Sequence, residues 1–300
     1  MAAKIIDGRK IAQRMREELK NEVENLKKSR GVVPGLGVIL VGDDPASRSY
    51  VRSKERACEK LGIYSDNNCL PATTSKQELL ELIERMNVDD KIDGILVQLP
   101  LPEHINEQAV ILAVNPDKDV DGFHPVNIGK MVAGQKCFLP CTPHGIIQLL
   151  IKSGIGIESS EVVIVGRSNI VGKPLANLLI QKNSMGNATV TVCHTRTKNI
   201  AEHTRRADIV VAAAGRPNVI TAEMIKEGAV VIDVGVNRVE DSSTEKGYRL
   251  VGDVDFESVK EKASMITPVP GGVGPMTITM LLYNTVDSAK QRASLKKGQE

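Results

Sequence analysis

The stretch Val162-Val163-Ile164-Val165-Gly166-Arg167-Ser168-Asn169-Ile170-Val171-Gly172-Lys173-Pro174 decides the fold of this chain. Its four leading apolar residues are typical of a buried strand, and the two glycines bound a tight turn. Pro174 then stands in the first turn of a predicted helix, where proline is favoured. Because a helix N-terminus presents unpaired N–H groups to anions, this pattern predicts a cradle for the phosphates of a dinucleotide.

The spacing of the glycines leaves a second interpretation open. Gly166 and Gly172 are six residues apart, and the fingerprint G-x-G-x-x-G is absent. An ordinary tight strand-to-helix turn would look the same.

The residues after the next predicted strand, 188–193, indicate which cofactor is bound. An NAD enzyme usually has an Asp or Glu there to bond the ribose 2′-hydroxyl, whereas this chain has His194-Thr195-Arg196-Thr197-Lys198. Basic and hydroxyl side chains suit a 2′-phosphate, and Arg167 offers a second guanidinium group. The sequence therefore favours NADP over NAD, unless Arg196 and Lys198 are only the solvated start of a helix.

The composition predicts a soluble globular chain. Its 300 residues, 41% hydrophobic and 25% charged, are enough for two domains with separate cores. A net charge of +2 and 2% aromatic residues argue against a nucleic-acid partner. No apolar run is long enough for a membrane span or a secretory signal, so we expect a cytoplasmic protein without a membrane partner.

The cysteines predict neither a disulfide framework nor a metal site. They are odd in number and contain no C-x-x-C pair, and we expect reduced thiols at Cys58, Cys69, Cys137, Cys141 and Cys193. His144 lies near Cys137 and Cys141, but no second ligand pair accompanies them. We therefore predict no metal.

Helical and strand patterns alternate along the chain, which predicts an α/β fold with parallel strands and right-handed crossovers. In the first half the predicted helices cover 11–26, 49–61, 76–87 and 106–114, and the predicted strands cover 36–41, 64–70 and 94–99. A loop-rich passage follows over 115–143. In the second half, predicted strands begin at 162, 188, 208, 229 and 264, and predicted helices at 142 or 143, 174, 199, 221 and 275, with a hairpin-like segment over 240–248.

Four polar residues of the first half are candidates for catalysis. Tyr50 and Lys54 lie four apart on one helix face, and such a lysine can carry protons once burial or a nearby cation lowers its pKa. Gln98 ends an apolar strand, where ligands bind in open α/β sheets. Asp121 lies in a tight turn. The structural alternatives are a packed tyrosine with a solvated lysine, a hydrogen-bonded strand end, and an aspartate that bonds its own backbone.

Three glycines and three prolines lie close together in Pro268-Val269-Pro270-Gly271-Gly272-Val273-Gly274-Pro275-Met276-Thr277. They predict a stiff loop that a flat ligand can approach closely before the last helix begins.

Six ordered motifs together resemble the bifunctional methylenetetrahydrofolate dehydrogenase/methenyltetrahydrofolate cyclohydrolase family. They are Tyr50-x-x-x-Lys54, Gln98-Leu99-Pro100-Leu101-Pro102, Lys118-Asp119-Val120-Asp121-Gly122-Phe123, Pro140-Cys141-Thr142-Pro143, Gly166-Arg167-Ser168-x-x-Val171-Gly172, and the glycine–proline loop. The resemblance spans almost the whole chain. It implies an N-terminal catalytic domain (1–142) completed by a C-terminal helix (275–300) that packs back on it, a Rossmann-like NADP-binding domain with a parallel sheet (143–274), a cleft between them, and a homodimer.

The resemblance also implies the reaction and the residue roles. NADP-dependent oxidation of 5,10-methylenetetrahydrofolate gives the methenyl form, which water opens to 10-formyltetrahydrofolate. It assigns proton transfer to Lys54, its positioning to Tyr50 and Gln98, and the pterin ring to Asp121. The implied folate contacts are Tyr50, Gln98, Leu99, Asp121, Pro270, Gly271, Gly272, Gly274 and Pro275. The implied cofactor contacts are Gly166, Arg167, Ser168, Ile170, Val171, Thr195, Arg196, Gly215, Val234, Gly235, Val236 and Thr277.

Two rival functions remain open from the sequence. One is a different NAD(P)-dependent dehydrogenase with the same two-domain layout, which would not need the glycine–proline loop. The other is a protein that senses NADP without chemistry, against which the presence of Tyr50, Lys54, Gln98 and Asp121 argues.

Overall fold

The computed structural model describes residues 2–244 and 247–297, and the chain divides into two compact units. The large-sheet unit consists of Met1–Gln13 and Thr142–Thr277, and the small-sheet unit consists of Arg14–Cys141 and Ile278–Glu300. Each unit contains its own parallel sheet.

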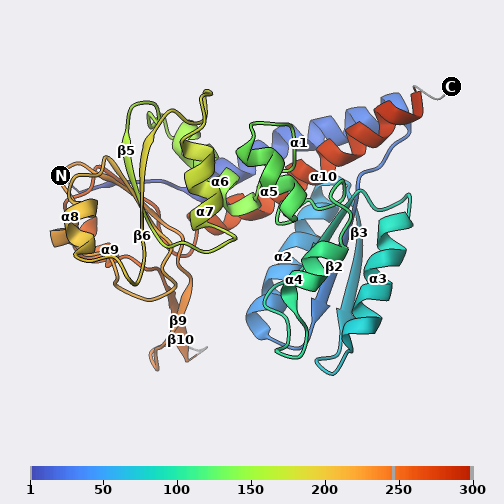
Figure 1. Cartoon of the computed structure of the whole chain (residues 1–300), viewed down its shortest axis with the longest axis horizontal. Coiled ribbons are helices and arrows are strands. Elements are labelled where there is room, and N and C mark those ends of the chain that lie inside the picture. The colour runs from blue at the N-terminus through green and yellow to red at the C-terminus, as the bar shows by residue number, and fades with distance from the viewer. Residues whose placement is uncertain (1, 245–246, 298–300) are drawn as a thin grey trace. The chain divides into compact units, whose positions relative to one another are not determined.

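The large-sheet unit is built on six parallel strands. In spatial order they are β1 (Lys4–Ile5), β11 (Met265–Ile266), β8 (Val230–Asp233), β7 (Ile209–Ala212), β5 (Glu161–Val165) and β6 (Thr189–Cys193). The chain runs from β5 to β6 on one side and then returns to β7 on the other. The strand order therefore reverses between β5 and β7, and ligands bind at the carboxyl ends of the strands at such a reversal. Figure 1 shows β5 and β6 side by side.

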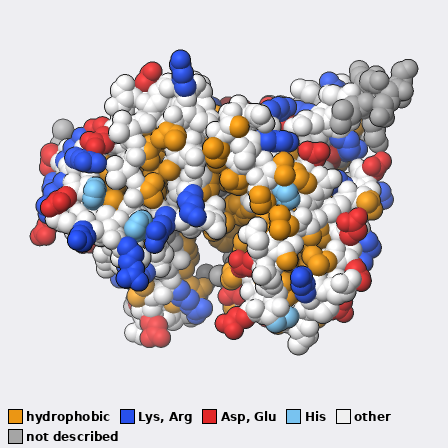
Figure 2. All heavy atoms as spheres, viewed as in Figure 1, with side chains coloured by type: hydrophobic (Ala, Val, Ile, Leu, Met, Phe, Trp, Pro, Cys, Tyr) orange, Lys and Arg blue, Asp and Glu red, His pale blue; other side chains and the backbone are white. Residues whose placement is uncertain are grey.

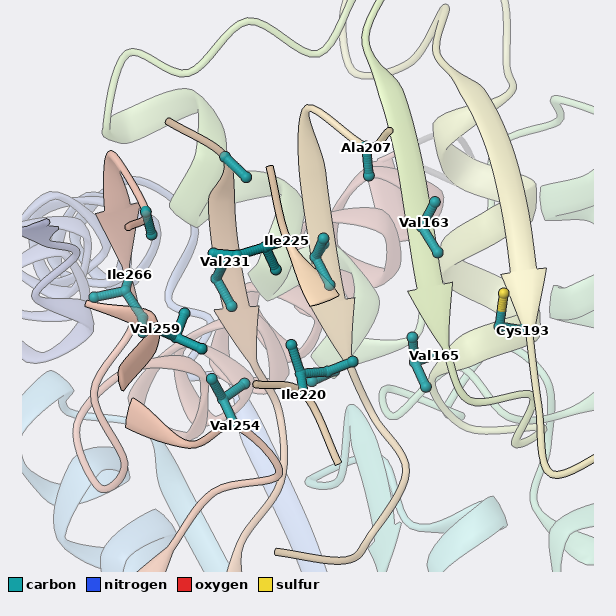
Figure 3. Packing of buried hydrophobic residues seen from close by; sticks show 14 residues of the cluster. Val163, Val165, Cys193, Ala207, Ile220, Ile225, Val231, Val254, Val259 and Ile266 are labelled. Carbon is teal, nitrogen blue, oxygen red and sulfur yellow. The ribbon is translucent and has the colours of Figure 1, made fainter. Parts of the chain in front are cut away.

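Short helices and a hairpin complete this unit. They are α6 (Cys141–Lys152), α7 (Gly172–Leu179), α8 (Ile200–Thr204), a 3₁₀ turn (Ala222–Met224), α9 (Phe256–Val259), and the antiparallel strands β9 (Asn237–Glu240) and β10 (Tyr248–Val251). Buried side chains of the strands pack with Ile220, Ile225, Val254 and Val259 in one core (Figure 3). The hairpin expected near 240–248 is confirmed.

Two predictions for this unit need correction, and two of its elements were not predicted. The helix expected from Thr221 is only the 3₁₀ turn, because Ile220 and Ile225 are both fully buried and the four residues between them leave room for one turn. The strand expected to begin at 264 contains only Met265–Ile266, and Pro268 and Pro270 beyond it have no N–H to donate to a ladder. Strand β1 and helix α9 were not predicted.

The small-sheet unit contains three parallel strands, in the order β3 (Tyr64–Leu70), β2 (Gly35–Val41) and β4 (Gly94–Val97). Its helices are α2 (Pro45–Leu61), α3 (Lys76–Val88), α4 (Glu107–Ala113), α5 (Pro125–Val132) and the larger parts of α1 (Gly8–Arg30) and α10 (Val273–Lys297). Figure 1 shows α2 and α3 on opposite sides of this sheet. Every residue of β2 is buried, as its unbroken apolar sequence predicts for a central parallel strand.

Local sequence explains where α2 begins and ends. Asp44 accepts a hydrogen bond from the Ser47 N–H at 2.7 Å, Pro45 occupies the first turn, and Gly62 ends the helix with a φ of +74°. The same signals mark α5, which lies inside the passage expected to be a loop. His124 caps it with Nδ1 and Pro125 follows at once, so the sequence did contain a start signal for this helix.

The last helix, α10, returns to the small-sheet unit, as predicted. Asn284 donates to the carbonyls of Val120 and Leu139 at 2.8 and 3.0 Å, and Ser288 donates to the carbonyl of Asp93 at 2.7 Å. Arg292 forms two hydrogen bonds with the carboxylate of Asp93, at 2.6 and 3.1 Å. These contacts make α10 part of this unit's core.

Side chains of both charges lie on the face shown in Figure 2, in keeping with the small net charge. Within residues 2–244 and 247–297, none of the helices combines the length and apolar character that a membrane span requires.

Candidate active site and cofactor loops

The topology of the small sheet brings Lys54 and Gln98 together. The chain passes from β2 to β3 on one side and returns to β4 on the other, so the strand order reverses between β2 and β4. Lys54 lies on α2, which follows β2, and Gln98 directly follows β4, where its N–H still donates to the Ile39 carbonyl at 2.8 Å. Both side chains therefore lie near the carboxyl ends of neighbouring strands, the usual ligand position in such sheets.

The amine of Lys54 is buried and held in place by an amide. The residue is only 5% exposed, and its Nζ donates to Gln98 Oε1 at 2.8 Å. The orientation of that amide is fixed because Gln98 Nε2 donates to the Leu99 carbonyl at 2.7 Å. The Tyr50 ring centroid lies 5.7 Å from Nζ. The alternative of a solvated lysine is therefore wrong.

Burial and charge shift the pKa values of this cluster toward neutral forms. Burial lowers the pKa of Lys54, opposed mainly by the negative charge of Asp121. Burial raises the pKa of Asp121 to about 6, although the charge of Lys54 acts in the opposite direction. Burial also raises the pKa of Tyr50. An amine and a carboxyl group that change protonation closer to neutral pH than usual suit a site of proton transfer.

Asp121 does not play the structural role that a turn aspartate often has. That role belongs to Asp119, whose carboxylate accepts hydrogen bonds from the N–H groups of Gly122, Phe123 and His124 and from the Asn127 amide, at 2.8 to 3.2 Å. No such backbone hydrogen bond is found for the Asp121 carboxyl among the described residues. Asp119 holds the turn, and Asp121 stays available for a ligand.

Two further residues, Cys141 and Asn284, neighbour this cluster and were not predicted as site residues. Cys141 lies close enough for its thiol to influence Lys54 and Asp121, and its Sγ donates to the Val120 carbonyl at 3.3 Å. From α10, Asn284 donates to the carbonyls of Val120, next to Asp121, and of Leu139. The motif Pro140-Cys141-Thr142-Pro143 was a signal for Cys141, whereas nothing local marks Asn284.

The predicted phosphate cradle lies at the strand reversal of the large sheet. Gly166 directly follows β5 and has a φ of +145°, and a Cβ built there would lie 2.1 Å from the carbonyl oxygen of Ala213, which directly follows β7. Gly172 is equally restricted, since its Cβ would lie 2.1 Å from the Gly166 carbonyl oxygen. Both glycines are thus required for the backbone to close this turn.

Ser168 shapes the turn between these glycines. Its Oγ accepts from the Val171 N–H at 3.1 Å, and Val171 is the residue before α7. Arg167, Ser168 and Ile170 are exposed, and Val171 is half-buried. Exposed side chains around a glycine-bounded helix N-terminus fit a dinucleotide phosphate chemically.

The turn after β6 exposes the residues predicted to contact a 2′-phosphate. The His194 N–H donates to Thr197 Oγ1 at 2.9 Å, and the Arg196 N–H donates to His194 Nδ1 at 3.1 Å. This local bonding leaves the side chains of Thr195 and Arg196 exposed.

The remaining predicted cofactor residues follow β7 and β8 or begin α10. Gly215, with a φ of +69°, is exposed, Val234 is half-buried, Gly235 is buried and Val236 is 54% exposed. The hydroxyl groups of Thr277 and Thr142 are 3.0 Å apart.

The glycine–proline loop packs against the start of α1. Gly271 has a φ of +117° and its carbonyl accepts from the Arg9 N–H at 3.1 Å, while a Cβ on Gly8 would lie 1.9 Å from the Gly272 carbonyl oxygen. Pro270 is exposed and Gly271 is half-buried, and Gly274 and Pro275 lie in the first turn of α10.

Two family models together match most of the chain. Residues 6–121 match the tetrahydrofolate dehydrogenase/cyclohydrolase catalytic domain, and residues 140–293 match the NAD(P)-binding domain of the same family. The bifunctional protein FolD of Syntrophus aciditrophicus is 62% identical over 98% of this chain and 100% of its own length.

Two solved structures of such enzymes are also similar. The FolD methylenetetrahydrofolate dehydrogenase/cyclohydrolase of Campylobacter jejuni has a TM-score of 0.90 and 50% identity, over 97% of this chain and 100% of its own. The FolD enzyme of Trypanosoma brucei, complexed with NADP and an inhibitor, has a TM-score of 0.92 and 42% identity, over 97% of this chain and 99% of its own. Full-length similarity at this level, together with both domain matches, shows that this chain belongs to the tetrahydrofolate dehydrogenase/cyclohydrolase family of bifunctional FolD enzymes.

Proposed function

We propose that Tyr50, Lys54, Gln98 and Asp121 form the site of folate chemistry in this bifunctional enzyme of one-carbon metabolism. The observation that carries the proposal is the buried Lys54 amine, which donates to the amide oxygen of Gln98 at 2.8 Å. The family's reactions are dehydrogenation of 5,10-methylenetetrahydrofolate and hydrolysis of the methenyl product. Both involve a cationic one-carbon unit, and a cation near Lys54 disfavours its ammonium form further.

Lys54 acts as the base in the hydrolytic step. Its neutral amine takes a proton from the water that adds to the methenyl carbon, and Gln98 Oε1 holds the nitrogen in position. The bond between this carbon and N5 then breaks, and N5 takes up a proton, which leaves the formyl group on N10. Tyr50 contributes an aromatic surface beside the amine, and Asp121 binds polar groups of the pterin ring. We keep the other implied folate contacts, Leu99, Pro270, Gly271, Gly272, Gly274 and Pro275, in this proposal.

We further propose that the cofactor is NADP. Bound NADP⁺ would supply the hydride acceptor for the dehydrogenase step. Gly166, Ser168 and the start of α7 would bind its phosphates, and Arg196, with Arg167, would bind the 2′-phosphate. Support comes from the exposure of both arginines, from the lack of an acidic residue in the turn 194–198, and from the bound NADP of the Trypanosoma brucei enzyme.

We also propose that the chain forms a homodimer, because the family that it resembles implies one. Size-exclusion chromatography with light scattering tests this proposal. A cytoplasmic location stays a prediction.

A two-step assay tests the proposed function. The purified chain is mixed with methylenetetrahydrofolate and NADP⁺, and absorbance is followed for the nicotinamide and for the methenyl product; preformed methenyltetrahydrofolate is then supplied without nucleotide. We expect nucleotide-dependent oxidation in the first assay, with NADP⁺ preferred over NAD⁺, and enhanced hydrolysis in the second. Hydrolysis no faster than the uncatalysed rate would contradict the assignment of Lys54.

A further inference from the structure

Asp253 connects three segments at the carboxyl edge of the large sheet. Its Oδ2 accepts hydrogen bonds from the N–H groups of Ala214 and Gly215, at 2.6 and 2.8 Å, in the loop after β7. Its Oδ1 accepts from the amide of Asn237, at the start of β9, at 2.8 Å. Asp253 is fully buried and follows β10.

Asp233, at the end of β8, also accepts hydrogen bonds from backbone N–H groups of separate segments. Its carboxylate accepts from the N–H groups of Gly235 at 3.0 Å, Asp253 at 2.9 Å and Val254 at 3.0 Å. It is 3% exposed, and burial raises its pKa to about 6. Asp233 therefore fixes the loop after β8 to the segment that carries Asp253.

The two carboxylates interlock with glycines that leave no room for a side chain. A Cβ on Gly235 would lie 2.1 Å from Asp253 Oδ1, and a Cβ on Gly252 would lie 1.7 Å from Asp233 Oδ2. The loop after β7 in turn contacts the phosphate turn, through the close approach of Gly166 to the Ala213 carbonyl. One contact network thus joins all three loops at the strand reversal.

A role in the fold alone explains this pair poorly. Among the described residues neither carboxylate forms an ion pair, and a buried anion without a cation partner opposes folding. An ionised carboxylate does, however, bind several N–H groups more strongly and with tighter geometry than a neutral acceptor. That property is useful where loops must be held rigid for a ligand.

We propose that Asp233 and Asp253 are positioning residues that hold the loops after β7 and β8 in the form that binds the nicotinamide cofactor. This inference rests on the proposed function and on Gly215, Val234, Gly235 and Val236, the cofactor contacts that the family resemblance implies for these loops. Neither aspartate touches the cofactor in this assignment. Each acts through backbone N–H groups that it orients, so the loops are organised before the cofactor arrives.

A polarity swap tests the proposal. In Asp253→Asn, the side-chain oxygen can still accept from Ala214 and Gly215, but the negative charge is lost and the new NH₂ group pairs with Asn237 only if that amide rotates. We expect the KM for NADP⁺ to rise about tenfold in this variant, the usual effect of losing a charge-assisted hydrogen bond. Adding Asn237→Asp restores a donor–acceptor pair, and the double variant should recover most of the affinity although Asn237→Asp alone is impaired.

The matched control is Asp208→Asn. Asp208 also accepts a backbone N–H, from Glu161 at 2.7 Å, but at the amino end of β5, and its replacement should leave the KM for NADP⁺ unchanged. Hydrolysis of methenyltetrahydrofolate without nucleotide is an internal control in every variant. It should be unchanged, because Tyr50, Lys54, Gln98 and Asp121, the residues proposed to carry out the folate chemistry, belong to the small-sheet unit.

Two results would overturn the inference. One is an unchanged KM for NADP⁺ in Asp253→Asn, and the other is an equal loss of both activities without recovery in the double variant, which would show a role in folding only. If Asp253→Asn cannot be purified folded, Asn237→Ala removes one donor to the same carboxylate, and an unchanged KM there would also overturn it. A wild-type chain without nucleotide-dependent oxidation would instead contradict the proposed function.

Discussion

Lys54, which we propose as a catalytic residue, lowers the stability of the folded chain. Its amine has a single hydrogen-bond acceptor, Gln98 Oε1, among the described residues, and burial disfavours its charge. The folded protein therefore binds the Lys54 proton less tightly than the unfolded chain does. As the pH falls from the unfolded value of 10.5 through the lowered folded pKa, stability is lost, and below that pKa the loss is complete.

The substitution Lys54→Met separates the effect of this residue on activity from its effect on stability. We expect it to abolish hydrolysis of methenyltetrahydrofolate and to leave part of the dehydrogenase activity, because hydride transfer depends mainly on alignment of two rings. We also expect the free energy of unfolding at pH 7 to rise by about 1 kcal/mol, since an unbranched apolar chain replaces a buried amine. Both assays and a urea titration check this, and unchanged hydrolysis would refute the role of Lys54 as base.

The raised pKa of Asp121 makes stability depend on pH in the direction opposite to that of Lys54. Its folded pKa of about 6 lies above the unfolded value of 3.8, so the fold retains the proton and wild-type stability declines as the pH rises from about 4 to about 6. Asp121→Asn lacks this titration. Urea titrations at several pH values should show a stability advantage of the variant that grows over this interval and is constant above it, whereas a pH-independent difference would contradict the shift.

At the scale of elements, the sequence predicted the helices and strands that are marked by a pattern of neighbouring residues. Strand β5, its turn and α7 were recognised from four apolar residues, two glycines and one proline, and α1 from an apolar stripe. Strand β1 could not be predicted, since its two residues pair with Met265 and Ile266 from the far end of the chain. Helix α5 was missed although His124 and Pro125 mark its start, because the many glycines and prolines around it favoured a loop.

The turn between β5 and α7 gives a prediction at this scale. Gly166→Ala places a Cβ 2.1 Å from the Ala213 carbonyl oxygen at a φ that only glycine adopts readily, so the turn must move. We expect a loss of about 2 kcal/mol in the free energy of unfolding and a higher KM for NADP⁺. Gly156→Ala is the control, because nothing lies within 4 Å of its Cβ. Equal effects of the two substitutions would contradict the steric argument.

The turn after β6 gives a second prediction at the scale of elements. Arg196→Asp should raise the KM for NADP⁺ about tenfold and the KM for NAD⁺ much less, because only NADP⁺ carries the 2′-phosphate. Lys182→Asp makes the same charge change at an exposed site in the segment before β6 and should affect neither. Steady-state kinetics with both cofactors measure the difference, and equal losses for both would show that Arg196 does not read the phosphate.

At the scale of the whole molecule, the sequence predicted the candidate site residues that belong to a local motif and missed those that do not. Tyr50, Lys54, Gln98 and Asp121 each belong to a motif, and topology alone explains why Lys54 and Gln98 meet. Asn284 was missed because it acts 164 residues from its partner Val120, and Asp253 because its partners Ala214 and Gly215 lie 39 and 38 residues earlier. Such contacts depend on the assembled fold and leave no local pattern.

The pair of Arg292 and Asp93 tests whether α10 is an integral part of the small-sheet unit. The two residues are 199 positions apart, and Asp93, 2% exposed, also accepts from the Gly35 N–H at the start of β2. Arg292→Met leaves this carboxylate buried without its cation, which should lower the free energy of unfolding by about 3 kcal/mol. Asp93→Asn combined with Arg292→Met removes the buried charge and should recover most of that loss.

Hydrolysis and NADP⁺ binding, each measured against urea concentration, should report separately on the unfolding of the two units. If α10 completes the small-sheet unit, Arg292→Met loses hydrolysis of methenyltetrahydrofolate at a lower urea concentration than the wild type, while binding of NADP⁺ to the large-sheet unit is lost later. Simultaneous loss of both would mean that the chain unfolds as one cooperative whole. A urea midpoint identical to that of the wild type would mean that the ion pair contributes nothing, and that the packed face of α10, with Leu281, Val286 and Ala289 buried, holds the helix without it.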